Sequence, residues 1–66
     1  MKLTINGQPA TVTEALRLPD LLALKGLTPE RLVVELNGEI VPKSRYHEVI
    51  LKEQDCLELL SFVGGG

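Results

Sequence analysis

The sequence predicts an α+β fold in which a mixed sheet of four to five strands packs against one main helix. Two dipeptides, Asn6-Gly7 and Asn37-Gly38, favour the positive φ angles of tight hairpin turns. Between these two turns, the apolar residues of segment 18–26 follow the spacing of an amphipathic helix and no longer the two-residue period of a strand. Strands before and after a single helix indicate a sheet that covers one side of that helix.

The chain opens with a pattern that is typical of a β-hairpin. Leu3 and Ile5 alternate with polar residues up to the Asn6-Gly7 turn, and the return strand is expected at about residues 8–13. Pro9 lies in this second strand and cannot donate a hydrogen bond to a neighbour. We therefore expect the second strand at the edge of the sheet.

The following segment predicts one short helix. Pro19 suits the first turn of a helix, and Gly26 suits its C-terminal cap. The helical spacing places four leucines largely on one face, which we expect to pack on the sheet: Leu18, Leu21, Leu22 and Leu24.

The second half of the chain returns to strands. Residues 32–36 form a β-branched run that ends at Asn37-Gly38, residues 43–47 indicate a 3₁₀ or irregular turn, and residues 53–55 form a polar turn. The last strand is expected at residues 56–63. A right-handed crossover through the helix would make the strand after it parallel to the first strand. The predicted arrangement is a β-grasp.

Composition and charge exclude several classes of protein. Seven basic and nine acidic residues give a formal net charge of −2, without a basic cluster that would bind nucleic acid. The N-terminus lacks the apolar stretch of a secretory signal, and no segment is long enough to span a membrane. With a single cysteine, we expect a soluble cytoplasmic protein: one domain at residues 1–63 and a flexible glycine tail at residues 64–66.

The sequence lacks the usual catalytic groupings. His47 and Cys56 are the only residues of their kinds, and no pair of residues has metal-ligand spacing. We interpret His47 as a surface residue and Cys56 as a small residue at the start of a strand. The chain is therefore expected to bind no metal and no cofactor itself, and not to be an enzyme.

The three terminal glycines are the strongest functional signal. Without side chains, Gly64, Gly65 and Gly66 could enter a narrow channel and carry the α-carboxylate of Gly66 into a partner's active site. A carboxylate reacts poorly until its oxygen becomes a good leaving group, so a partner that uses ATP would have to form an acyl-adenylate. The alternative is that these glycines are only a frayed end.

A second signal lies beside the tail. Glu58 marks the outward face of the last strand, and the two-residue period places Leu60 and Phe62 on the same face. Val33 extends this apolar patch on a neighbouring strand. Adjacent apolar side chains on a solvent face favour a docking site for a partner, although loops could instead shield them. The alternate positions are expected in the core: Leu57, Leu59 and Val63.

Four segments together carry a resemblance to a known family. They are the Asn6-Gly7 hairpin, the run from Asn37 to Lys43 with its Val-Pro-Lys end, the turn acid Asp55, and the Phe-Val-Gly-Gly-Gly ending at 62–66. With these features in so short a chain, the sequence resembles the ThiS family, the sulfur carriers of thiamin biosynthesis within the ubiquitin-like β-grasp superfamily.

The resemblance implies a function for the tail. An E1-like adenylyltransferase of the ThiF type would use ATP to adenylate the Gly66 carboxylate, and a sulfur-donating persulfide enzyme would supply the sulfur of a thiocarboxylate. Thiazole synthase of the ThiG type would then take this sulfur to build the thiazole phosphate ring. Gly65 and Gly66 carry over as the functional tail. The expected partner contacts are Gly64, Leu60, Phe62 and Val33.

Two departures from the family pattern and two alternatives accompany this resemblance. Tyr46 stands where the family often has tryptophan, and residues 53–55 replace a turn that commonly contains glycine. One alternative is a small subunit of molybdopterin synthase, which shares the fold and the Gly-Gly end but is usually longer. The other is a ubiquitin-like binding module whose tail is never activated. No nucleic acid or membrane partner is expected.

Overall fold

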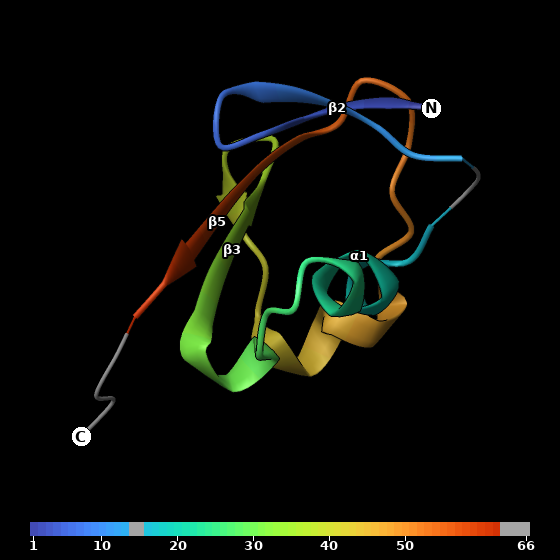
Figure 1. The fold of residues 1–66 in the computed structure, drawn as a ribbon. Coiled ribbons are helices and arrows are strands. Elements are labelled where there is room, and N and C mark those ends of the chain that lie inside the picture. The colour runs from blue at the N-terminus through green and yellow to red at the C-terminus, as the bar shows by residue number, and fades with distance from the viewer. Residues whose placement is uncertain (14–15, 63–66) are drawn as a thin grey trace.

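A five-stranded mixed sheet forms the body of the protein, and helix α1 lies against one of its faces (Figure 1). The computed structural model describes residues 1–13 and 16–62. Within them the strand order is β2-β1-β5-β3-β4, which confirms the predicted β-grasp arrangement. The elements are β1 (Lys2–Ile5), β2 (Gln8–Thr11), α1 (Leu18–Leu24), η1 (Pro29–Arg31), β3 (Leu32–Leu36), β4 (Glu39–Ile40), η2 (Lys43–Glu48) and β5 (Cys56–Ser61).

Both predicted asparagine-glycine turns are present. The φ angles are 52° at Asn6 and 78° at Gly7, and 52° at Asn37 and 89° at Gly38. Positive φ at both central residues is the geometry that matches the twist of a two-residue hairpin. The turns join β1 to β2 and β3 to β4, and Pro9 lies in β2 at the edge of the sheet, as predicted.

The predicted direction of β3 is wrong. β3 pairs antiparallel with β5 over five residue pairs, from Leu32 opposite Ser61 to Leu36 opposite Leu57. β5 in turn pairs parallel with β1, so β3 runs antiparallel to β1. The last strand inserts between β1 and β3, and the crossover rule therefore applies to β1 and β5 rather than to β1 and β3. β5 becomes the central strand of the sheet.

Helix α1 buries a narrower stripe of leucines than the sequence predicts. Leu18, Leu21 and Leu22 are buried, but 73% of Leu24 is exposed. At 3.6 residues per turn, a residue two positions after Leu22 falls on the opposite side of the helix. The helix ends as predicted, because Gly26 follows its last turn with φ at 69°.

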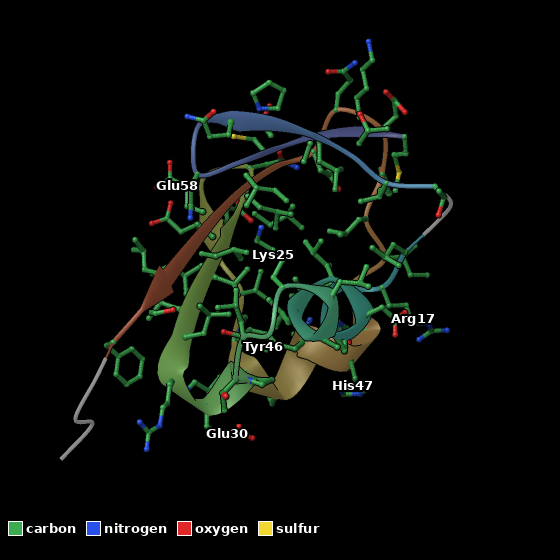
Figure 2. All side chains as sticks on the ribbon, in the orientation of Figure 1. Arg17, Lys25, Glu30, Tyr46, His47 and Glu58 are labelled. Atoms are coloured by element: carbon green, nitrogen blue, oxygen red, sulfur yellow. The ribbon has the colours of Figure 1, made fainter. Side chains whose placement is uncertain are left out.

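The core lies between α1 and the sheet, and Tyr46 of η2 closes one side of it (Figure 2). The Tyr46 hydroxyl donates a hydrogen bond to the Leu32 carbonyl at 3.2 Å, which ties η2 to β3. The buried apolar residues are Leu3, Ile5, Leu18, Leu21, Leu22, Leu32, Val34, Tyr46, Leu51, Leu57 and Leu59.

Burial of Tyr46 predicts a loss of stability at high pH. Desolvation raises the pKa of the Tyr46 hydroxyl above its ordinary value of 10.0, and a backbone hydrogen bond at Val34 opposes this in part. The unfolded chain then releases this proton at a lower pH than the folded chain does. The stabilising contribution is present below about pH 10 and falls as the pH rises further. Between pH 8 and pH 11, the free energy of unfolding measured in urea should decrease less for Tyr46→Phe than for the wild type.

The turn before β5 depends on a buried carboxylate. Asp55 accepts hydrogen bonds from the Lys52 backbone N–H at 2.8 Å and from Asn37 Nδ2 at 3.0 Å. Asn37 Oδ1 accepts one from the Cys56 backbone N–H at 2.9 Å. Asp55 therefore ties the start of β5 to the β3–β4 hairpin, and the segment 53–55 is more than an exposed polar turn.

Gln54 occupies the conformation that a glycine would adopt without strain. Its φ angle is 72°, a region that costs a residue with a side chain about 1–2 kcal/mol. Gln54→Gly should therefore raise the free energy of unfolding by about 0.5–1 kcal/mol, after the greater freedom of glycine in the unfolded chain is subtracted. Urea denaturation measures this. A decrease in stability would show that the Gln54 side chain contributes more than its backbone strain removes.

Candidate functional site

Strand β5 leads to the predicted tail and is held on both sides. On the β1 side, Asn6 N–H donates to the Leu57 carbonyl at 2.9 Å. The Asn6 side chain then continues the ladder beyond β1: Leu59 N–H donates to its Oδ1 at 2.7 Å, and its Nδ2 donates to the Leu59 carbonyl at 3.2 Å. On the β3 side, Phe62 N–H donates to the Arg31 carbonyl at 3.0 Å. These contacts fix the direction of the strand up to Phe62.

The alternation of burial along β5 confirms the predicted faces. Leu57 and Leu59 are 0% and 5% exposed, whereas Leu60 and Phe62 are 53% and 40% exposed. Figure 2 shows Glu58 on the side of β5 away from α1. Loops of the described residues therefore do not shield Leu60 and Phe62. The predicted core position at residue 63 lies outside the described residues.

The predicted apolar patch extends over three strands. Val33 lies directly opposite Leu60 in the β3–β5 pair and is half-buried. Ile40 is 67% exposed and lies opposite Glu35, which faces the same way as Val33. Sequence reasoning missed Ile40, because its place in the sheet depends on the β3–β4 register.

Lys43 contacts Phe62, the last residue that the structure describes. Its ammonium Nζ lies 5.5 Å from the centroid of the Phe62 ring and donates a hydrogen bond to the Glu30 carbonyl at 2.8 Å. A cation over an aromatic face is attracted by the ring. The Val-Pro-Lys run therefore contacts the segment that leads to the tail, although the two are far apart in the sequence.

The predicted tail residues Gly64, Gly65 and Gly66 lie outside the described residues, so their roles remain predictions. His47 is exposed in η2, with its Nε2 3.7 Å from Glu48 Oε2, and Cys56 is exposed at the start of β5, both as interpreted from the sequence. Residues 1–13 and 16–62 contain no group of three acidic, histidine or cysteine side chains that could hold a metal ion. Among the same residues, no helix has the length and apolar character needed to cross a membrane.

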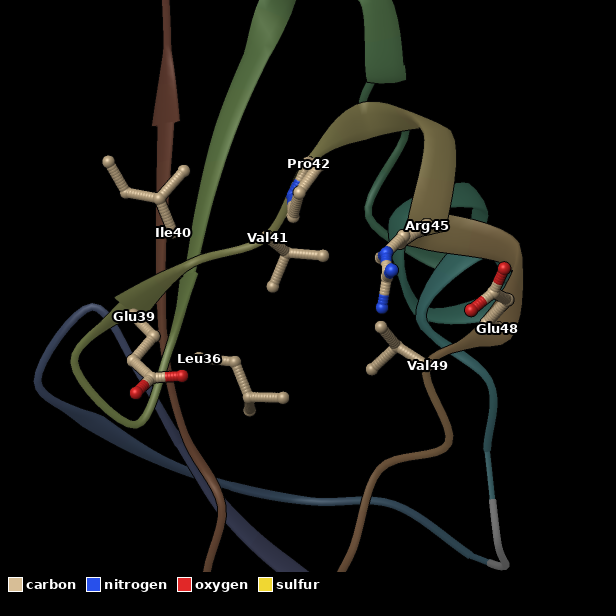
Figure 3. A pocket seen from close by; sticks show the side chains of 8 residues that line it. All are labelled: Leu36, Glu39, Ile40, Val41, Pro42, Arg45, Glu48 and Val49. Carbon is tan, nitrogen blue, oxygen red and sulfur yellow. The ribbon is translucent and has the colours of Figure 1, made fainter.

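A shallow cavity of about 280 Å³ lies between β4 and η2 (Figure 3). Apolar side chains form its floor, and Arg45 and Glu48 stand at its side toward η2. None of the residues predicted to bind partners lines it. The lining residues are Leu36, Glu39, Ile40, Val41, Pro42, Arg45, Glu48 and Val49.

Because Leu60 is exposed, its substitution should weaken partner binding without much change in the stability of the fold. Leu60→Lys should change the free energy of unfolding by no more than about 0.5 kcal/mol, because the side chain lies on the surface. The same change should weaken binding to a partner that docks on the patch. Leu24→Lys, which alters an exposed leucine on α1, is the matched control. Severe destabilisation by Leu60→Lys in urea unfolding would contradict the orientation of β5.

Comparisons with known proteins agree with the fold and the sequence pattern. The model of the ThiS family matches residues 3–66. The crystal structure of a thiamine biosynthesis protein (ThiS) from Geobacter metallireducens superposes with a TM-score of 0.83 and 43% identity, over 100% of both chains. The sulfur carrier protein ThiS of Bacillus subtilis is 49% identical over 49 residues, 74% of each sequence.

The chain also matches part of a larger protein. A thiazole synthase of Paramagnetospirillum magneticum is 41% identical over 66 residues, which is all of this chain but 20% of that protein. The chain thus spans about one fifth of the length of this relative. The family model covers nearly every residue, and the Geobacter structure covers the whole fold. The chain therefore belongs to the ThiS family, together with the Bacillus sulfur carrier and the Geobacter thiamine biosynthesis protein.

Proposed function

We propose that this chain is a sulfur carrier of thiamin biosynthesis whose working group is the α-carboxylate of Gly66. The observation that carries the proposal is the extent of the family match, which runs through residue 66 and includes all three glycines. The geometry of β5 supports it, because two strands and the Asn6 side chain hold the segment that leads to the tail. A carrier of this kind is a co-substrate of other enzymes.

The chemistry proceeds at the tail, inside partner enzymes. A Gly66 carboxylate oxygen attacks the α-phosphorus of ATP in an E1-like adenylyltransferase, and pyrophosphate leaves. The resulting acyl-adenylate has a good leaving group, AMP, at the carbonyl carbon. The outer sulfur of an enzyme persulfide attacks the carbonyl carbon and AMP leaves, which gives an acyl disulfide between Gly66 and the persulfide enzyme. A thiol then attacks the enzyme's sulfur, so that the S–S bond breaks, a new disulfide forms on the enzyme, and the Gly66 thiocarboxylate is released. The chain binds no cofactor in this scheme, since ATP belongs to the activating partner.

Thiazole synthase is the proposed acceptor of the sulfur. The Paramagnetospirillum relative bears that name, and a segment of it aligns with all of this chain. A carrier segment and a synthase within one polypeptide would meet at high effective concentration. This arrangement supports the proposal that the two also work together when they are separate proteins. The relatives favour this acceptor over molybdopterin synthase. We place the reaction in the cytoplasm.

Reconstitution with purified enzymes tests the proposal. The chain, the activating enzyme, ATP, the persulfide enzyme and thiazole synthase with its small substrates should yield thiazole phosphate, measured by chromatography. Omission of the chain should abolish the product. A parallel reaction with the large subunit of molybdopterin synthase should give no molybdopterin. Product formation only in this parallel reaction would contradict the proposed pathway.

A further inference from the structure

Five side chains form a surface on the side of the sheet turned away from α1. Glu35 of β3 lies directly opposite both Glu58 of β5 and Ile40 of β4. The neighbouring cross-strand pair is Val33 and Leu60. Directly opposite residues of adjacent antiparallel strands point to the same face of a sheet. We name these five residues the outer face.

The centre of the outer face holds two carboxylates, Glu35 and Glu58, which form no ion pair within the part of the chain that the structure describes. Like charges directly opposite each other destabilise a pair of strands. Among residues 1–13 and 16–62, the one ion pair joins His47 to Glu48, so neither Glu35 nor Glu58 is paired with a basic group there. Glu35 is also half-buried, and water and salt screen a charge less there than at a fully exposed site. A positive group from another molecule would convert this repulsion into attraction.

Apolar side chains flank the two carboxylates. Ile40 and Leu60 are 67% and 53% exposed, in contrast to the polar residues that usually cover the water-facing side of an antiparallel sheet. Apolar groups around a charged centre exclude water when a partner docks, and the charge then contributes more to binding. The outer face thus combines both features of a protein interface on one continuous surface.

We propose that the outer face binds thiazole synthase through an arginine of the synthase that lies between Glu35 and Glu58. This inference rests on the proposed function. The planar guanidinium group carries five N–H donors, so it can donate hydrogen bonds to two carboxylates at once. Apolar side chains beside that arginine contact Leu60 and Ile40. The synthase is the occupant because relatives of that name contain a segment similar to the whole chain.

The outer face also continues toward the tail. Two residues after Leu60, just beyond the end of β5, lies Phe62, which is 40% exposed. A synthase that binds the outer face would therefore stand next to the segment that leads to Gly66. Recognition of the carboxylates would set the orientation of the carrier, because complementary charges fix the register of an interface.

Charge reversal tests the inference. Binding of the chain to purified thiazole synthase is measured by calorimetry, with Glu35→Lys and Glu58→Lys as test variants. Glu39→Lys is the matched control, since Glu39 lies opposite Leu36 on the other face and the change in net charge is the same. We expect each test variant to raise Kd at least about tenfold and the control to change it less than about twofold. The urea midpoint of Glu58→Lys should equal or exceed that of the wild type, because the change removes a repulsion.

Several outcomes would overturn the inference. Equal Kd values for Glu58→Lys and Glu39→Lys would do so, and so would weaker binding to the activating enzyme with unchanged binding to the synthase. The wild-type chain separates this failure from failure of the proposed function. If the wild type accepts sulfur and Glu58→Lys supports normal thiazole formation, this inference alone is wrong. If the wild type accepts no sulfur, the proposed function itself is wrong.

Discussion

Deletion of Gly66 is expected to abolish sulfur loading and to leave the fold intact. The remaining Gly65 carboxylate would end about 3.5 Å short of the position that the activating enzyme requires. Misplacement by a single ångström can already lower the rate about 10²-fold, so no loaded product should be detected by mass spectrometry. The fold should persist because the described core is built from residues between Leu3 and Leu59.

Two controls complete this deletion experiment. Gly66→Ala keeps the length of the chain and adds one methyl group, so it tests whether the partner's channel is as narrow as the glycines predict. Circular dichroism and urea unfolding should be the same for the deletion variant and the wild type. Undiminished loading of the shortened chain, or loss of its cooperative unfolding, would contradict the role of the tail.

Leu57→Ala is expected to have the largest effect on stability. Leu57 is 0% exposed in the central strand, and truncation of a buried leucine costs about 2–5 kcal/mol. Small domains are stable by about 5–15 kcal/mol, and this chain of 66 residues should lie near the lower limit. A substantial fraction of the variant should therefore be unfolded at 37 °C, and sulfur transfer should fall with it.

Leu60→Ala is the matched control for Leu57→Ala. It removes the same atoms from the same strand, but from a side chain that is 53% exposed. Its free energy of unfolding should fall by less than about 1 kcal/mol. Urea unfolding of the two variants gives the comparison directly. Equal losses of stability would mean that the two faces of β5 are assigned incorrectly.

Local features of this fold could be predicted from the sequence. Asn6-Gly7 and Asn37-Gly38 specify their turns through the φ angles that these residues tolerate, which depend little on the rest of the chain. The two faces of β5 followed from its two-residue period. Leu24 was assigned wrongly to the buried face of α1. It is a leucine like the buried residues of that face, but its position around the helix axis turns it toward solvent.

Features that depend on distant residues could not be predicted. The direction of β3 depends on which strand lies beside β1, and β5 takes that place from the end of the sequence. The bonds of the Asn6 side chain to Leu59 depend on the same pairing. The contact of Lys43 with Phe62 and the opposition of Glu35 to Glu58 likewise required the strand register. The outward positions of Leu60, Phe62 and Val33 were therefore predicted, but the charges beside them were not. The tail glycines lie outside the described residues and stay a prediction.

The intact mass of the chain tests the central claim most directly. After incubation with the activating enzyme, ATP and the sulfur donor, the account predicts a gain of ~16 Da, the exchange of one carboxylate oxygen for sulfur. Fragmentation should place this gain at Gly66, and omission of ATP should abolish it. An unchanged mass under all of these conditions, or a gain located elsewhere in the chain, would contradict the account.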